Sequence, residues 1–471
     1  MLFNSIEFAI FLPLVLMSYY ALRKIHLQNL LLLAASYVFY GAWDARFLSL
    51  LLLSTVIDYA AGSALGKMDD EPRRKLILFS SVGSQLVILA FFKYFGFFVE
   101  SAIGLLGFFG LEPNAPLLEV LLPVGISFYT FQTISYTFDV YRRRMPPAKN
   151  FINFATFVSY FPQLVAGPIE RAQVLLPQIE TERRRPNSEQ IRSGLTLMLM
   201  GLFKKVAIAD AVAPIVNRAF TEGSSGGRGL LLLGVIGFAL QIYGDFCGYT
   251  DIARGTSRLF GIELMRNFEQ PYLSRSITEF WRTWHISLSS WLHDYLYVPL
   301  GGNKNGPSKT YRNLLLTMLL GGLWHGAAWT FVVWGALHGL VLAIHRAFGG
   351  YVARGALPPL AWRQFPSIVG TFALVSLLWV FFRADTLTQA SDYLIGLVNA
   401  PWGSPLTDDV LIVVTSLLFV LCLDLSQRFT GQHAAILRWP ALARGAGTAV
   451  LLLSILVWTG GSSQPFIYFQ F

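Results

Sequence analysis

Two histidines stand in segments rich in tryptophan and leucine, and both are candidates for chemistry. His325 lies in the run Leu-Leu-Gly-Gly-Leu-Trp-His-Gly-Ala-Ala-Trp, and His285 lies forty positions earlier in Phe-Trp-Arg-Thr-Trp-His-Ile-Ser-Leu-Ser. An ionisable side chain at membrane depth is costly, so its presence there indicates function by default. Burial disfavours the charged imidazolium, and we therefore expect a neutral His325. A neutral imidazole can accept a proton from a hydroxyl group, which is the role of a general base in acyl transfer.

Each histidine also has a purely structural interpretation. His325 could pack between helices with its ring bonded to a backbone carbonyl. His285 could face lipid headgroups from a helix that lies in the membrane interface. The residue pattern alone leaves both interpretations open.

The sequence does not indicate a metal site. Two histidines do not define a zinc site without further ligands, and no H-E-x-x-H spacing is present. Cys247 and Cys422 belong to no metal-binding or redox spacing. No G-x-S-x-G motif is present either, so a serine nucleophile is not indicated. We expect no bound metal and no bound cofactor.

The segment around His285 has the pattern of an amphipathic helix. Ser276 and Glu279 have the spacing of a capping box, which predicts a helix start. Apolar and aromatic residues then recur at helical spacing on one face, with a polar stripe beside them. A helix with so many tryptophans is typical of the membrane interface. The apolar face comprises Phe280, Trp281, Trp284, Leu288, Trp291, Leu292 and Tyr295, and the stripe comprises Arg282, His285, Ser289 and His293.

His325 is expected within a helix over residues 323–346 that is apolar all round. Gly335 and Gly339 form a small-xxx-small step, which lets a second helix approach closely. We expect His325 to share the face of these glycines, in a helical hairpin over residues 314–346.

The composition places both segments in a membrane protein. Of the 471 residues, 54% are hydrophobic and only 13% are charged, against about 25% charged in soluble domains. Apolar stretches long enough to cross a bilayer recur throughout. We predict one all-α, polytopic membrane domain over residues 1–471, with roughly ten to twelve transmembrane helices plus re-entrant and interfacial helices. The interrupted segment 151–169 is the expected re-entrant element.

The net charge of +9 does not indicate nucleic-acid binding. The basic residues fall in short clusters between apolar stretches, as expected for cytoplasmic loops. No base-reading module is present. The clusters are Arg23–Lys24, Arg73–Lys75, Arg142–Arg144 and Arg183–Arg185.

These motifs together resemble the membrane-bound O-acyltransferase family, in its bacterial branch typified by the alginate O-acetyltransferase membrane subunit. The resemblance covers nearly the whole chain. Its segments include Leu-Pro-Val-Gly-Ile-Ser-Phe-Tyr (122–129), Phe-Pro-Gln-Leu-Val-Ala-Gly-Pro-Ile (161–169), Asn-Phe-Glu-Gln-Pro-Tyr (267–272) and Gly-Gly-Leu-Trp-His-Gly-Ala (321–327). The sequence departs from the family pattern at Thr283, His293 and Cys247, where arginine, arginine and serine are common.

The resemblance implies a reaction and a location. It implies that acetyl groups pass from a cytoplasmic thioester, acetyl-CoA, across the bacterial inner membrane to an extracytoplasmic polysaccharide such as alginate or cellulose. The acceptor hydroxyl belongs either to the polymer or to a serine of a periplasmic acetyltransferase partner. His325 matches the essential intramembrane histidine of the family and His285 its second signature histidine. Asn267, Arg282, Asp294 and Trp324 are then expected to support substrate binding.

Three alternatives differ in chemistry. A transporter would also use intramembrane histidines, but the paired repeats common in transporters are not found. A D-alanyl transferase acting on teichoic acid and a lipid-directed acyltransferase are rivals within the enzyme class.

Overall fold

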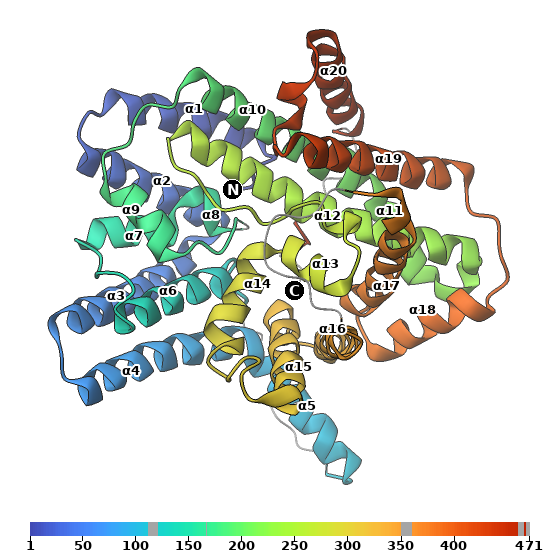
Figure 1. Cartoon of the computed structure of the whole chain (residues 1–471), viewed down its shortest axis with the longest axis horizontal. Coiled ribbons are helices and arrows are strands. Elements are labelled where there is room, and N and C mark those ends of the chain that lie inside the picture. The colour runs from blue at the N-terminus through green and yellow to red at the C-terminus, as the bar shows by residue number, and fades with distance from the viewer. Residues whose placement is uncertain (112–120, 166, 350–359, 460–465, 468–471) are drawn as a thin grey trace. The chain divides into compact units, whose positions relative to one another are not determined.

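The computed structural model describes residues 1–111, 121–165, 167–349, 360–459 and 466–467, and this part of the chain is built from helices and their connections without β-strands (Figure 1). The chain divides into two compact units. One comprises residues 1–194 and 256–265, and the other comprises residues 195–255 and 266–471. The all-α prediction is therefore confirmed.

The described residues of the first unit form nine α-helices. A five-residue π-helical turn, Ala90–Tyr94, joins two of them without a break. The helices are α1 (Ile6–Ala21), α2 (Ile25–Asp44), α3 (Leu48–Lys67), α4 (Glu71–Leu89), α5 (Phe95–Phe108), α6 (Ile126–Tyr141), α7 (Phe151–Ser159), α8 (Phe161–Leu164) and α9 (Ala172–Glu180).

The second unit contains the remaining described helices. The first residues of α10 and the last residues of α12 belong to the first unit. Two π-helical turns, Lys204–Asp210 and His293–Tyr297, continue helices in this unit. The helices are α10 (Ser188–Phe203), α11 (Ala211–Glu222), α12 (Gly227–Leu259), α13 (Ile277–Thr283), α14 (Ile286–Leu292), α15 (Gly306–His325), α16 (Trp329–Ala347), α17 (Phe365–Arg383), α18 (Leu387–Asn399), α19 (Thr407–Thr430) and α20 (Ala441–Trp458).

Seven helical stretches of the described residues are long and apolar enough to cross a membrane. This confirms a polytopic helical membrane protein. Three of the stretches contain more than one α-helix, and the expected ten to twelve crossings stay a prediction. The stretches are Ile25–Lys67, Glu71–Phe108, Ser188–Leu259, Trp329–Ala347, Trp362–Arg383, Thr407–Thr430 and Ala441–Trp458.

The predicted interruption in segment 151–169 is present between α7 and α8. Tyr160 has non-helical backbone, and residues 153–165 are buried in the first unit. The side-chain amides of Gln132 and Gln163 both donate to the carbonyl oxygen of Phe157, at 2.9 and 2.6 Å. Broken backbone is tolerated at membrane depth when protein groups satisfy it in this way. Its re-entrant position in the membrane stays a prediction.

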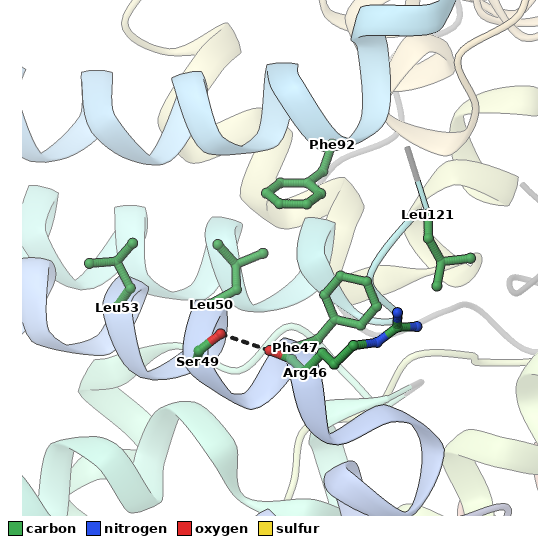
Figure 2. Close-up of a pocket in the computed structure, with 7 residues that line it drawn as sticks. All are labelled: Arg46, Phe47, Ser49, Leu50, Leu53, Phe92 and Leu121. Carbon is green, nitrogen blue, oxygen red and sulfur yellow. Dashed lines mark hydrogen bonds between the residues drawn. The ribbon is translucent and has the colours of Figure 1, made fainter. Parts of the chain in front are cut away.

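A small cavity of about 380 Å³ lies in the first unit, beside the turn between α2 and α3 (Figure 2). The described residues that line it are mainly apolar, and one of them, Arg46, is charged. The Arg46 guanidinium is paired with the carboxylate of Asp44 at 2.6 Å. Ser49 caps the turn by donating its hydroxyl to the Arg46 carbonyl oxygen, at 2.7 Å. These contacts complete the turn between α2 and α3.

Helices α15 and α16 form the predicted hairpin in the second unit. A Cβ atom added to Gly335 would lie 2.3 Å from the carbonyl oxygen of Met318, and one added to Gly339 would lie 3.1 Å from the Cα of Leu315. Both glycines therefore allow the close helix approach that their spacing predicted. The prediction of one helix over residues 323–346 is wrong, because α15 ends at His325 and α16 begins at Trp329.

Candidate active site

The chain breaks its helix immediately before His285. Helix α13 ends at Thr283, α14 begins at Ile286, and His285 has φ 43° and ψ 54°. This left-handed backbone region is unfavourable for residues with a Cβ atom. The predicted continuous amphipathic helix through His285 is therefore wrong. Strained backbone of this kind is found at functional sites, where the surrounding structure holds it in place.

Asn267 provides the contacts that hold the break. Its backbone oxygen accepts from the Ile286 N–H at 2.9 Å, and its side-chain oxygen accepts from the Ser287 N–H at 3.1 Å. The Glu269 N–H donates to the Thr283 carbonyl oxygen at 2.9 Å. These bonds replace the helical hydrogen bonds lost at the interruption. Asn267 is thus placed to position His285.

The capping box before α13 is present in part. The Ser276 hydroxyl accepts from the Glu279 N–H at 3.3 Å, as the sequence predicted. The Glu279 carboxylate accepts from the backbone N–H and the guanidinium of Arg275, at 3.1 and 2.7 Å. The start of α13 is therefore fixed on both sides.

The two histidines meet in the second unit, although His285 lies in the break between α13 and α14 and His325 belongs to α15. His325 is the last residue of α15, and its ring centroid lies 6.2 Å from that of His285. The Trp324 indole contacts both imidazoles, with centroid distances of 5.8 Å to His285 and 5.0 Å to His325. All three side chains are buried, and His285 is fully so. The burial of His285 contradicts the interpretation that it faces lipid headgroups.

Aromatic side chains from three further helices surround the pair. Phe246 of α12 contacts His285 edge to face at 4.6 Å. The rings of Trp334 in α16 and Phe382 in α17 contact the His325 imidazole, with centroid distances of 5.2 and 5.3 Å. These residues exclude water from the imidazoles and limit their movement. Sequence spacing does not reveal these three residues, because they lie 48 to 136 positions from one another and only the tertiary fold brings them together.

A cavity of about 670 Å³ lies beside the break, which is within the usual size range of ligand sites. Arg282, Asp294 and Ile286 line it, together with Arg346. The Asp294 carboxylate is bonded to Nδ1 of the neighbouring His293 at 2.8 Å. Of the six residues predicted for the site, the structure brings His285, His325 and Trp324 together, places Asn267 behind the break and places Arg282 and Asp294 at the cavity.

Buried ion pairs in the second unit were also missed from the sequence. The ammonium of Lys204 pairs with Asp251 at 2.8 Å, and that of Lys205 pairs with Asp245 and Asp210, each at 2.9 Å. Both lysines lie in a π-helical turn, a feature that often marks a functional or specialised position in a helix. Two adjacent lysines within a long apolar stretch could have indicated these buried ion pairs from the sequence.

Burial makes His285 sensitive to acid. It lies outside the candidate membrane-spanning stretches, and burial lowers the pKa of its imidazole to about 3. The folded pKa is below the ordinary value, so the unfolded chain binds the proton first and stability falls as pH drops from about 6.5 toward 3. At about pH 5 the expected loss is about 2 kcal/mol relative to neutral pH.

Thermal unfolding of the purified protein in detergent measures this loss. The drop in Tm between about pH 7.5 and pH 5 should be smaller in His285→Asn, whose side chain does not titrate in this range. An equal drop in both proteins would show that other groups cause the acid sensitivity.

Comparison with known proteins agrees with the geometry. The model of the membrane-bound O-acyltransferase family matches residues 7–380. The chain is 46% identical over 394 residues to a probable alginate O-acetylase of Azotobacter vinelandii, covering 83% of this chain and 76% of the relative. It is 36% identical over 435 residues to a peptidoglycan O-acetyltransferase of Helicobacter pylori. That match covers 85% of this chain and 80% of the relative.

A more distant relative carries out a different transfer. The chain is 26% identical over 276 residues to a teichoic acid D-alanyltransferase of Bacillus subtilis, covering 56% of this chain and 69% of the relative. The match to the O-acetyltransferases is both longer and higher in identity, and the matched proteins are transferases rather than transporters. The chain is an O-acyltransferase and belongs to the membrane-bound O-acyltransferase family.

Proposed function

We propose that this enzyme transfers acetyl groups from cytoplasmic acetyl-CoA across the bacterial inner membrane to hydroxyl groups of an extracytoplasmic polysaccharide. The observation that carries the proposal is the buried His285–His325 pair, enclosed by aromatic side chains and joined by Trp324. The names of the O-acetyltransferase relatives support acetyl transfer to a cell-surface or secreted polymer. The whole chain, with both compact units, acts as one catalytic domain.

His325 acts as the general base. Its imidazole accepts the proton of the acceptor hydroxyl while the hydroxyl oxygen forms a bond to the thioester carbonyl carbon. The carbon–sulfur bond then breaks, and the imidazolium returns the proton to the departing thiolate, which leaves as a thiol. The imidazole ends in its starting state, so no further reactant is needed. The aromatic walls keep water away from the thioester, which prevents hydrolysis.

His285 stabilises the charge that develops during this reaction. Its low pKa keeps the ring neutral, so one ring nitrogen carries a hydrogen that can be donated to the thioester oxygen. Hydrogen-bond donors aimed at a developing oxyanion lower the barrier of acyl transfer. The fixed backbone at the break, held by Asn267, keeps this donor in position.

The cavity beside the break receives the donor. The guanidinium groups of Arg282 and Arg346 suit phosphate oxygens, which arginine binds through paired N–H groups. The cavity reaches Ile286, the residue after His285, so a flexible pantetheine arm can bring its thioester toward the pair. Asp294 orients His293 at the same wall, and Trp324 provides a flat surface for the acyl group.

The acceptor approaches from the extracytoplasmic side. It is the hydroxyl of the polymer itself or of a serine in a periplasmic acetyltransferase partner that completes the transfer. Alginate and peptidoglycan are named as substrates of the relatives. The two routes share the same chemistry at His325.

Complementation of a deletion strain tests the proposal. The strain should lose O-acetyl groups from its exopolysaccharide, and the wild-type gene should restore them. The variant His325→Ala should be present in the membrane at normal level but leave the polymer unacetylated. His26→Ala removes an exposed histidine of α2 and serves as the matched control with normal acetylation.

Two outcomes would overturn the proposal. Normal acetylation with His325→Ala would make this histidine a packing residue. An unchanged polymer in the deletion strain itself would show that the enzyme serves a different acceptor.

A further inference from the structure

The end of the described chain is buried in the second unit. Phe466 is 0% exposed and Ile467 is 2% exposed, values typical of a protein core. Both residues lie beyond residue 380, where the match to the family model ends. Nothing in the family comparison therefore assigns them a role.

Two contacts fix these residues to one face of α12. The Ile467 N–H donates to the Asp245 carboxylate at 2.6 Å. The Phe466 ring lies against that of Tyr249, with centroids 4.2 Å apart. The other carboxylate oxygen of Asp245 is paired with Lys205, so the anchor is itself held in place. The terminal segment is thus attached through its backbone and through its side chain.

The same face of α12 supports the catalytic pair. Phe246 follows Asp245 in sequence, and its ring lies 6.2 Å from that of Phe466 and 4.6 Å from the imidazole of His285. The three side chains form a continuous row of rings from the terminal segment to the histidine. Phe466 therefore packs against Phe246, the ring that contacts His285.

His285 depends on such support more than an ordinary helical residue does. Its backbone lies in the left-handed region between two helices, and a residue in that region persists only where its surroundings hold it. Asn267 fixes the backbone after the break, and the Phe246 ring packs against the imidazole. The Ser287 hydroxyl lies 3.5 Å from Nδ1 of the imidazole, and the packing of Phe246 against the ring further limits how it can turn.

We propose that the C-terminal segment Phe466–Ile467 positions His285 for acyl transfer, with Phe466 holding Phe246 against the imidazole. The proposal rests on the proposed catalytic role of His285. Phe466 is a positioning residue, because it acts on the histidine through Phe246. A purely structural role would instead stabilise the fold without affecting the reactivity of His285.

The first test uses chemical modification of the purified full-length protein. Diethylpyrocarbonate labels accessible imidazoles, and mass spectrometry reads the labelling of each histidine. In Phe466→Ala the labelling of His285 should rise at least about fivefold, because a freed ring exchanges with solvent-exposed arrangements. Phe466→Leu keeps most of the side-chain volume and should leave the labelling near the wild-type value.

The matched control removes a similar aromatic stack elsewhere in the second unit. Phe220 is buried, and its ring stacks on that of Tyr393 with the two centroids 4.4 Å apart. Phe220→Ala should lower thermal stability by an amount similar to Phe466→Ala but leave His285 labelling unchanged. If both variants raise the labelling equally, the terminal segment contributes stability alone and the proposal fails.

The second test measures transfer in inverted membrane vesicles with acetyl-CoA labelled in the acetyl group. Phe466→Ala should lower kcat about tenfold with the KM for acetyl-CoA within about twofold, as expected when an interaction made only in the transition state is weakened. A normal kcat in the surviving Phe466→Ala enzyme would overturn the proposal. A fully active His325→Ala in the same vesicles would reject the proposed function, while the labelling of His285 would still report on the terminal segment.

Discussion

Replacing His285 by alanine should lower the rate of acetyl transfer by about two to three orders of magnitude, which is the usual cost of losing one oxyanion donor. The enzyme should still reach the membrane, because alanine fits the space and adds no polar group. Single-turnover transfer from labelled acetyl-CoA measures the chemical step separately from product release.

Asparagine is the matched comparison at this position. It tolerates the left-handed backbone and carries an N–H donor, whereas alanine has no donor. His285→Asn should therefore retain a rate at least about tenfold above that of His285→Ala. Equal rates for the two variants would show that the imidazole does more than donate a hydrogen bond. A wild-type rate for His285→Ala would exclude the histidine from the reaction.

Asp251→Ala should destabilise the protein by about 3–5 kcal/mol, because it leaves the buried ammonium of Lys204 without its carboxylate partner. Both side chains are at most 3% exposed, so water cannot take the place of the missing charge. The expected result is a much lower Tm and less protein in the membrane, measured by thermal unfolding in detergent and by immunoblot.

The double variant Lys204→Met with Asp251→Leu separates charge from packing. It removes both charges and keeps apolar volume, so it should recover at least half of the stability lost in Asp251→Ala, since apolar replacement of a buried pair is often neutral or stabilising. Asp392→Ala, which removes an exposed carboxylate, is the control and should change Tm little. If the double variant is as unstable as Asp251→Ala, the lost stability comes from packing or from the buried guanidinium of Arg254, which also pairs with Asp251 at 3.7 Å.

The sequence was informative where local chemistry determined the structure. The histidines were found because ionisable residues are rare in apolar segments, and the hairpin was found because Gly335 and Gly339 have the spacing of a close helix contact. The cap at Ser276 was also local. These features depend on residues a few positions apart.

The breaks at His285 and Gly326 could not be found in the same way. Helical spacing continues through Trp284 and His285, and the contacts that oppose it come from Asn267, some twenty positions away. The tertiary bonds of Asn267 override the local preference. The partner of Lys204 is likewise 47 positions distant, so the lysine could be noticed in the sequence but its carboxylate could not be identified.

The buried ion pairs also constrain how the chain enters the bilayer. Lys204 and Lys205 lie on the α10–α11 arm of the stretch Ser188–Leu259, and Asp245 and Asp251 lie on the α12 arm. Lys205 has a second partner, Asp210, on its own arm, and Asp251 has one in Arg254, but in the described part of the chain Lys204 and Asp245 form ion pairs only across the two arms. Either arm alone would therefore carry a charge without its partner into the lipid, at about 2.5–3.5 kcal/mol for a lysine or aspartate at the centre of a helix. The two arms are therefore expected to leave the translocation machinery together, as a hairpin whose charges are already neutralised. Biosynthesis of the enzyme then depends on the turn at residues 223–226, which allows the second arm to reach the first during insertion.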